Sequence, residues 1–112
     1  MTPNNERIIV IFITTPTKEA SEQIARTLVE KKLVACVNVL PEIQSIYQWQ
    51  GKIETSSEQL LLLKTTDNNF CEIERLVCEI HPYETPEILS IEASQLSSKY
   101  RQWVLDSTQV TL

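Results

Sequence analysis

Glycine is almost absent from this chain of 112 residues: Gly51 stands alone, where about seven per hundred is usual. A Walker loop and a dinucleotide-binding fingerprint each need several glycines to bring the backbone close to phosphate, so both are excluded. Histidine is equally scarce, with His81 alone. No serine or cysteine lies in a recognisable nucleophile elbow that would complete a catalytic triad. We therefore expect a protein that is not an enzyme.

Basic clusters and long apolar runs are also missing. The net charge is -5 and the longest run of basic residues is Lys31-Lys32, which argues against nucleic acid or an anionic membrane surface as a partner. No apolar run approaches the roughly 20 residues that cross a bilayer. Residues 1–7 contain no basic region followed by an apolar one, so no signal peptide is visible and we expect a cytoplasmic protein.

The three cysteines are too few, and odd in number, for a disulfide framework. Cys71 and Cys78 fall two turns apart on a predicted helix, about 10 Å, which exceeds the roughly 7 Å Cα limit for a disulfide. No Cys-x-x-Cys or Cys/His spacing suits zinc. We expect Cys36, Cys71 and Cys78 to serve as small buried apolar residues.

The hydrophobic pattern predicts two βαβ halves joined by a hairpin, followed by one more helix. The predicted strands are 7–14, 33–49 with an interruption at Pro41, 53–66 and 87–93, and the predicted helices are 18 to 31 or 32, about 70–80 and 98–107. This order is typical of an α+β, ferredoxin-like βαββαβ sandwich, in which both main helices cover one face of an antiparallel sheet. We expect one domain over 1–112, with 1–6 as a flexible tail and 109–112 either frayed or an edge strand.

Several details of this plan are specific enough to test. The β-branched run of the first strand predicts a central strand covered on both faces. Thr17 is a predicted helix cap, and the polar residues 65–68 offer caps for the second helix. Asn38, within an apolar strand, is a candidate buried polar residue. Pro41 predicts a bulge or an edge position.

The hairpin is longer than the sheet that it enters. Its two arms run about 15 residues each, near 50 Å at roughly 3.3 Å per residue, whereas the strands at 7–14 and 87–93 are half as long. The outer half, which holds Tyr47, Trp49 and the turn at 50–52, must then project beyond the four-stranded core. Because a bare two-stranded ribbon is marginal in water, we infer that neighbouring subunits cover it in a closed, symmetric oligomer. The alternative is a hairpin that folds back over its own helices.

The stretch from His81 to Ile88 combines two prolines, a tyrosine, two carboxylates and the single histidine. Pro82 and Pro86 disfavour helix at the residues before them, so the second helix must end near Ile80. A neutral imidazole beside Glu84 suits Cu(II), Ni(II) or Zn(II). The alternative is that His81 caps the helix or bonds a backbone group at the corner.

Further candidates for a binding site are aromatic or charged. Tyr47, Trp49, Tyr83 and Trp103 either line a small-molecule cleft or anchor a subunit interface. Lys64, at the end of a leucine run, either holds an anionic ligand or pairs with Glu84 or Glu87. These last two glutamates are themselves candidates for the cleft.

A group of motifs in this sequence resembles one family. The chain contains Ala35-Cys36-Val37-Asn38, Ser45-Ile46-Tyr47-Gln48-Trp49-Gln50-Gly51-Lys52, Glu58 with Leu63-Lys64-Thr65, His81-Pro82-Tyr83-Glu84-Thr85-Pro86-Glu87-Ile88, and Tyr100 with Trp103. In order and spacing this set resembles the CutA proteins over about residues 8–103. The resemblance implies a ferredoxin-like fold assembled as a homotrimer through the long hairpin, similar to the PII signalling proteins. It also implies a cytoplasmic protein linked to tolerance of divalent cations, copper especially, with no established catalytic activity.

The resemblance implies a copper site that this sequence keeps only in part. Some members bind copper through a cysteine and two adjacent histidines, and the matching positions here are Ile13, Ile80 and His81. Only His81 retains a ligating side chain.

Two functions follow as expectations. The first is a trimeric protein of metal tolerance that needs no cofactor and binds Cu(II) or another divalent cation weakly, through carboxylates and His81 at subunit contacts. The second is a PII-like regulatory module that binds a small anionic ligand between subunits with Lys64, Tyr83 and the aromatic residues.

Overall fold

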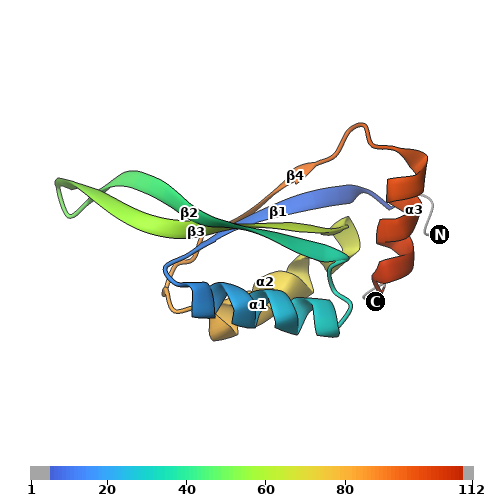
Figure 1. The fold of residues 1–112 in the computed structure, drawn as a ribbon, viewed down its shortest axis with the longest axis horizontal. Coiled ribbons are helices and arrows are strands. Elements are labelled where there is room, and N and C mark those ends of the chain that lie inside the picture. The colour runs from blue at the N-terminus through green and yellow to red at the C-terminus, as the bar shows by residue number, and fades with distance from the viewer. Residues whose placement is uncertain (1–5, 110–112) are drawn as a thin grey trace.

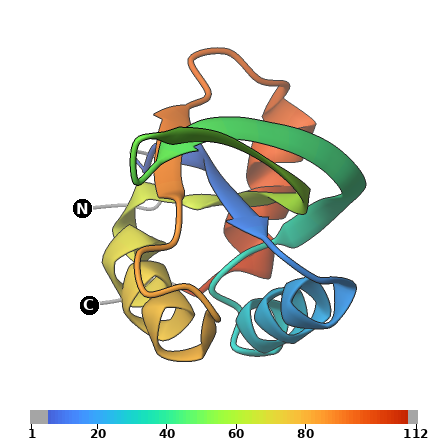
Figure 2. The ribbon, with the colours of Figure 1, turned by 90° about the vertical axis from the view of Figure 1, so that its left-hand side faces the viewer.

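The structure, a computed structural model, describes residues 6–109. Its elements follow the predicted order (Figure 1): β1 (Ile8–Thr15), α1 (Lys18–Glu30), β2 (Cys36–Trp49), β3 (Lys52–Thr66), α2 (Phe70–Ile80), β4 (Ile88–Glu92) and α3 (Ser98–Ser107). The four strands form one antiparallel sheet in the order β2-β3-β1-β4. Helices α1 and α2 lie side by side on one face, and α3 stands across one end of the sheet (Figures 1 and 2). The predicted α+β, ferredoxin-like fold is confirmed.

The core lies between the sheet and the two helices. Ile9, Ile11 and Ile13 of β1 alternate toward the helices, where Ile24 of α1 and Ile73 of α2 meet them without exposure to solvent. Each buried side chain of this size stabilises the fold by about 1.5–3 kcal/mol. Strand β1 pairs with β3 on one side and with β4 on the other. The loops that connect these strands to the helices therefore lie at the two ends of the sheet.

The opposite side of the sheet is only partly covered, contrary to the expectation that β1 is buried on both faces. Because successive residues of a strand point to opposite faces of a sheet, every second residue points to this side. We call this surface the open face. It comprises Val10, Phe12, Leu40, Leu60, Leu62, Leu89 and Ile91. Ile91 is 54% exposed and Leu89 is 47% exposed, because α1 and α2 occupy the other face.

The hairpin projects as predicted. Strand β1 pairs with β3 only from Gln59 to Thr66, so residues 43–49 and 52–58 pair only with each other and form a two-stranded ribbon. Figure 1 shows this ribbon extending past the ends of β1 and β4, and it lengthens the molecule to 49 Å. Gln50 and Gly51 both have positive φ, 51° and 79°, which is the geometry of a two-residue type I′ turn. The alternative of a hairpin folded over its own helices is excluded.

Strand β2 differs from its prediction at two points. It begins at Cys36 rather than Leu33, since Lys32 takes a positive φ of 58° and the chain turns there. Asn38 is exposed rather than buried, because β2 is an edge strand with little cover. The bulge at Pro41 is confirmed: Leu40 pairs with Leu60 and the next partners are Ile43 and Glu58. Two residues of β2 therefore oppose one of β3.

Caps predicted from the sequence form in α1 and α3 but not in α2. Thr17 accepts a hydrogen bond from the Ala20 N–H at the start of α1, and Ser97 accepts one from the Tyr100 N–H at the start of α3. A 3-10 turn over Asp67–Asn69 leads into α2 instead, and no side chain caps it. The side chains of Thr65 and Asn69 both donate hydrogen bonds to the carbonyl of Leu33. They therefore connect the turn between α1 and β2 to the end of β3 and the start of α2.

The chain ends and the cysteines also bear on the predictions. Residues 1–5 and 110–112 lie outside the described range. Glu6 is held in place, because its carboxylate accepts a hydrogen bond from Asn68 and its backbone carbonyl accepts one from Arg101.

Cys71 and Cys78 are exposed, which contradicts the expectation of buried thiols, because they fall on the solvent side of α2. Over residues 6–109 no helix is long and apolar enough to cross a membrane.

Candidate functional site

His81 holds the corner between α2 and β4. The helix ends at Ile80 as predicted, and His81 takes an extended conformation. Its side chain is 7% exposed, and its Nε2 lies 2.8 Å from the carbonyl oxygen of Thr14 at the end of β1. The backbone N–H of Tyr83 donates to Nδ1 at 3.0 Å. The imidazole therefore ties the corner to the first strand.

These two hydrogen bonds specify the tautomer of His81. Because Nδ1 accepts from an N–H, it carries no hydrogen, and Nε2–H donates to the carbonyl. Both ring nitrogens are thus engaged with backbone, and a metal ion must break one of the bonds to bind. Ile13 and Ile80 beside it supply no ligand atoms. The geometry favours the corner-holding alternative for His81 over the metal ligand.

Tyr83 reaches from the corner to the hairpin. Its hydroxyl donates to Oε2 of Glu58 at 2.7 Å, and its ring lies 5.0 Å from that of His81, centroid to centroid. Burial, helped by the hydrogen bond and the negative charge of Glu58, raises the pKa of Tyr83 to about 12. Tyr83 is therefore a neutral hydrogen-bond donor at physiological pH, and it joins two segments that lie 25 residues apart in the sequence.

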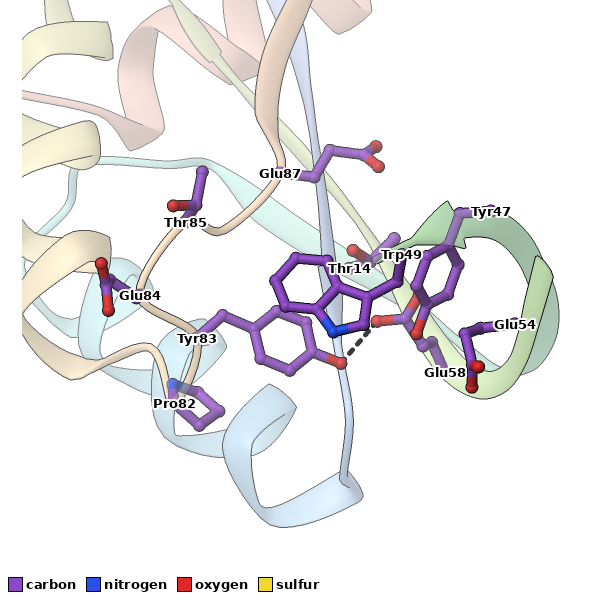
Figure 3. A pocket seen from close by; sticks show the side chains of 10 residues that line it. All are labelled: Thr14, Tyr47, Trp49, Glu54, Glu58, Pro82, Tyr83, Glu84, Thr85 and Glu87. Carbon is purple, nitrogen blue, oxygen red and sulfur yellow. Dashed lines mark hydrogen bonds between the residues drawn. The ribbon is translucent and has the colours of Figure 1, made fainter. Parts of the chain in front are cut away.

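A cavity of about 650 Å³ opens between these two segments (Figure 3), and we call it the corner–hairpin cavity. The hairpin contributes one wall, the corner contributes the other, and the end of β1 lies between them. The lining residues are Thr14, Tyr47, Trp49, Glu54, Glu58, Pro82, Tyr83, Glu84, Thr85 and Glu87. Its volume falls within the roughly 300–1,000 Å³ typical of small-molecule sites.

The cavity is acidic. Four of its lining residues are glutamates and none is basic. Within residues 6–109 the ion pairs join Arg7 to Glu92 and Arg75 to Glu72 and Glu79, so none of the four cavity glutamates has a basic partner there. In the same range no three histidine, cysteine, aspartate or glutamate side chains come close enough together to hold a metal ion.

The structure brings together most of the predicted cleft residues but not all. Tyr47, Trp49, Tyr83, Glu84 and Glu87 line the corner–hairpin cavity. Lys64 and Trp103 do not, since they lie on the open face and on α3.

The surroundings of Lys64 explain its exclusion. It sits opposite Cys36 in the register, and its ammonium group donates to Asn38 and approaches the Cys36 sulfur at 3.8 Å. It therefore pairs with neither Glu84 nor Glu87. Beside it, burial and the neighbouring Cys36 raise the pKa of Tyr100, and Tyr100 in turn packs against Trp103.

Glu54 and Glu58 were not chosen from the sequence as cleft residues. Both lie in the polar first half of β3, where glutamates are ordinary on an exposed strand. No local signal in the sequence marks Glu58, which lies opposite Ile43 just beyond the bulge at Pro41. Glu58 is only 8% exposed, and this burial depends on the corner that packs against it.

The chain matches the model of one protein family, described as CutA1 divalent ion tolerance protein, over residues 9–107. Among individual proteins, it is 42% identical to human Protein CutA over 98 residues, which are 88% of this chain and 55% of the human protein. It is 38% identical to the chloroplastic Protein CutA of Arabidopsis thaliana over 90% of this chain and 56% of that protein. The chain thus spans just over half the length of these two relatives. With the divalent-cation tolerance protein CutA of Thermus thermophilus it shares 40% identity over 88% of this chain and 96% of that protein.

Solved structures agree with this match. The CutA1 structure from Ehrlichia chaffeensis superposes with a TM-score of 0.89 at 36% identity, covering 95% of this chain and 99% of that one. The Thermus thermophilus structure gives 0.88 at 39% identity, covering 91% and 99%. A protein from Archaeoglobus fulgidus, described as the periplasmic divalent cation tolerance protein CutA, gives 0.88 at 36% identity, covering 91% and 99%.

Proposed function

Because the chain belongs to the CutA1 divalent ion tolerance family, we propose that it serves divalent-cation tolerance as a cytoplasmic homotrimer that binds cations weakly and catalyses no reaction. Copper(II) is the first candidate among those cations, and no cofactor is required. The observation that carries the proposal in this chain is the acidic corner–hairpin cavity. Its four glutamates have no basic partner within residues 6–109.

Weak binding follows from how the carboxylates are placed. Oxygen ligands suit hard divalent cations, but no group of three potential ligands gathers within residues 6–109. One or two glutamates therefore hold a hydrated ion while water completes its coordination. A tighter site needs ligands from a second subunit at the rim of the cavity.

An anionic ligand finds little support in this cavity. Lys64 was its expected contact, and Lys64 is engaged with Asn38 away from the lining. With four carboxylates and no basic lining residue, the cavity repels an anion. The same feature favours a cation.

Two features support the homotrimer. The open face presents a row of apolar side chains to solvent, and large exposed apolar surfaces mark sites of protein–protein contact. The ribbon exposes more of the same kind, with Ile53 at 78% and Trp49 at 62% exposure. A closed ring of three copies covers both surfaces and protects the unpaired ribbon edges.

Calorimetric titration with copper(II), and with magnesium as a hard-ion comparison, tests the binding. We expect weak binding that Glu87→Gln reduces and that Glu74→Gln, an exposed substitution on α2, leaves unchanged. Absence of heat with both metals at millimolar concentration contradicts cation binding. Light scattering tests the assembly, and a mass equal to one chain contradicts the trimer.

A further inference from the structure

We propose that the corner–hairpin cavity binds an organic cation, an alkylpolyamine, between the aromatic rings of the hairpin and the glutamates of the corner. This inference goes beyond metal tolerance, because it assigns the cavity a ligand of a different chemical class.

The arrangement of charges in the cavity suits a long ligand better than a single ion. Its four glutamates come from separate places: Glu54 and Glu58 from β3, Glu84 and Glu87 from the corner. Within residues 6–109 no three such groups converge on one point. Tight binding of a metal ion needs convergent oxygens, whereas a polyamine carries separated ammonium groups that match separated carboxylates.

The wall between the carboxylates is aromatic. Tyr47, Trp49 and Tyr83 all line the cavity. Figure 3 shows the rings of Tyr47 and Trp49 on the hairpin side near Glu54 and Glu58, and the ring of Tyr83 reaching toward them from the corner. Aromatic faces attract ammonium groups through the ring quadrupole and pack against methylene groups. A strongly hydrated metal ion gains little from such a wall. Rings and carboxylates together therefore select a cation that also has an apolar chain.

Glu58 gives the site its buried anchor. It is 8% exposed, and the hydroxyl of Tyr83 is bound to its Oε2. Within residues 6–109 no protein group donates to its Oε1, which solvent in the cavity can reach, because the buried side-chain oxygens without a partner belong to Gln59 and Thr66. No basic group lies within 4 Å of the carboxylate. A carboxylate with so little exposure and no counter-charge gains from a cation placed beside it. An ammonium group entering the cavity supplies that charge and can take the place of water at Oε1.

The fluorescence of Trp49 provides a direct test. The chain has two tryptophans, and Trp103→Phe leaves Trp49 as the sole emitter beside the cavity. Titration of the assembled Trp103→Phe protein with spermidine is expected to change this emission saturably at sub-millimolar concentration. Octane-1,8-diol, which has a similar chain but no charge, should leave the emission unchanged.

Matched Glu→Gln variants in the same background locate the site. Glu58→Gln is expected to weaken spermidine binding at least tenfold, and Glu87→Gln at the rim to weaken it a few-fold. Glu74→Gln removes one charge from the outer surface of α2 and should leave affinity unchanged. If circular dichroism shows that Glu58→Gln does not fold, the spermidine affinity of Glu87→Gln is compared with that of Glu74→Gln instead.

The possible results separate cleanly. Loss of affinity confined to the cavity variants supports the proposal. Equal loss in Glu74→Gln overturns it, because spermidine then responds only to net charge. The proposal is also overturned if spermidine leaves Trp49 emission unchanged, or if tetramethylammonium binds and spermidine does not. A copper(II) titration of the same protein is read separately, so that failure of metal binding does not decide the polyamine result.

Discussion

Replacing His81 should damage the fold rather than a metal site. The imidazole is buried and joins two backbone groups, the carbonyl of Thr14 and the N–H of Tyr83. His81→Ala removes both hydrogen bonds and leaves a space where the ring packed. Among the side-chain hydrogen bonds of residues 6–109, no other links residues 82–87 to the end of β1, and the next connection is the pairing of Ile13 with Ile88.

The magnitude follows from the groups left without partners. A buried donor or acceptor that loses its partner costs about 1–3 kcal/mol. The Thr14 carbonyl is buried and should cost near the upper end, whereas water can reach the more exposed Tyr83 N–H and limit its cost. We therefore expect His81→Ala to lower the free energy of unfolding by about 2–5 kcal/mol, a large part of the roughly 5–15 kcal/mol typical of a domain.

Two conservative variants divide this effect. In His81→Asn the Oδ1 atom can accept from the Tyr83 N–H as Nδ1 does, but nothing donates to Thr14. In His81→Gln the Nε2 amide can donate to Thr14 as the imidazole does, but the Tyr83 N–H loses its acceptor. Each should lose about half of what His81→Ala loses, with Asn the more damaging because the Thr14 carbonyl is buried.

Urea unfolding at one fixed protein concentration measures these differences, since assembly makes apparent stability depend on concentration. Copper(II) calorimetry on folded His81→Asn gives the second measurement, and we expect the affinity of wild type. The reasoning is refuted if His81→Ala unfolds with wild-type stability. It is equally refuted if His81→Asn folds normally but loses copper binding tenfold.

Three further predictions concern the hairpin, the corner and the open face. The pKa of Tyr83 is about 12 in the folded state, against about 10 when unfolded, so its stabilising contribution is complete below pH 10 and lost as pH rises through 12. Tyr100 also has a raised pKa, so absorbance titration of tyrosinate should show two groups that ionise late, and Tyr83→Phe should remove one of them. An unchanged titration curve contradicts the hydrogen bond to Glu58. In Gly51→Ala the new Cβ meets no atom within 4 Å, so only the positive φ should lower the free energy of unfolding, by about 1 kcal/mol. Thermal unfolding measures this change, and unchanged stability would contradict the turn geometry. Ile91→Asp should reduce the mass in light scattering toward one chain while Val29→Asp, an exposed control on α1, keeps the assembled mass; identical masses would exclude the open face as the interface.

Local chemistry was sufficient to predict the fold. Pro82 and Pro86 restrict the residues before them, so the end of α2 and the direction of β4 could be predicted from the sequence. A lone glycine between two strand patterns predicted the turn at Gly51, and the unequal strand lengths predicted the projecting ribbon. These features depend on φ preferences and on periodicity, which act within a few residues.

Tertiary packing alone decided the site. Glu58 looked like any glutamate of an exposed strand until the corner packed over it, and Lys64 looked like a cleft residue until its register with Cys36 placed it on the open face. His81 had two open interpretations, and only the positions of Thr14 and Tyr83 showed that both nitrogens are engaged. The contact of His81 with Thr14 joins residues 67 positions apart, and that of Tyr83 with Glu58 joins residues 25 positions apart, so no local pattern encodes them. The sequence determined which elements form, and the way they pack determined which side chains meet.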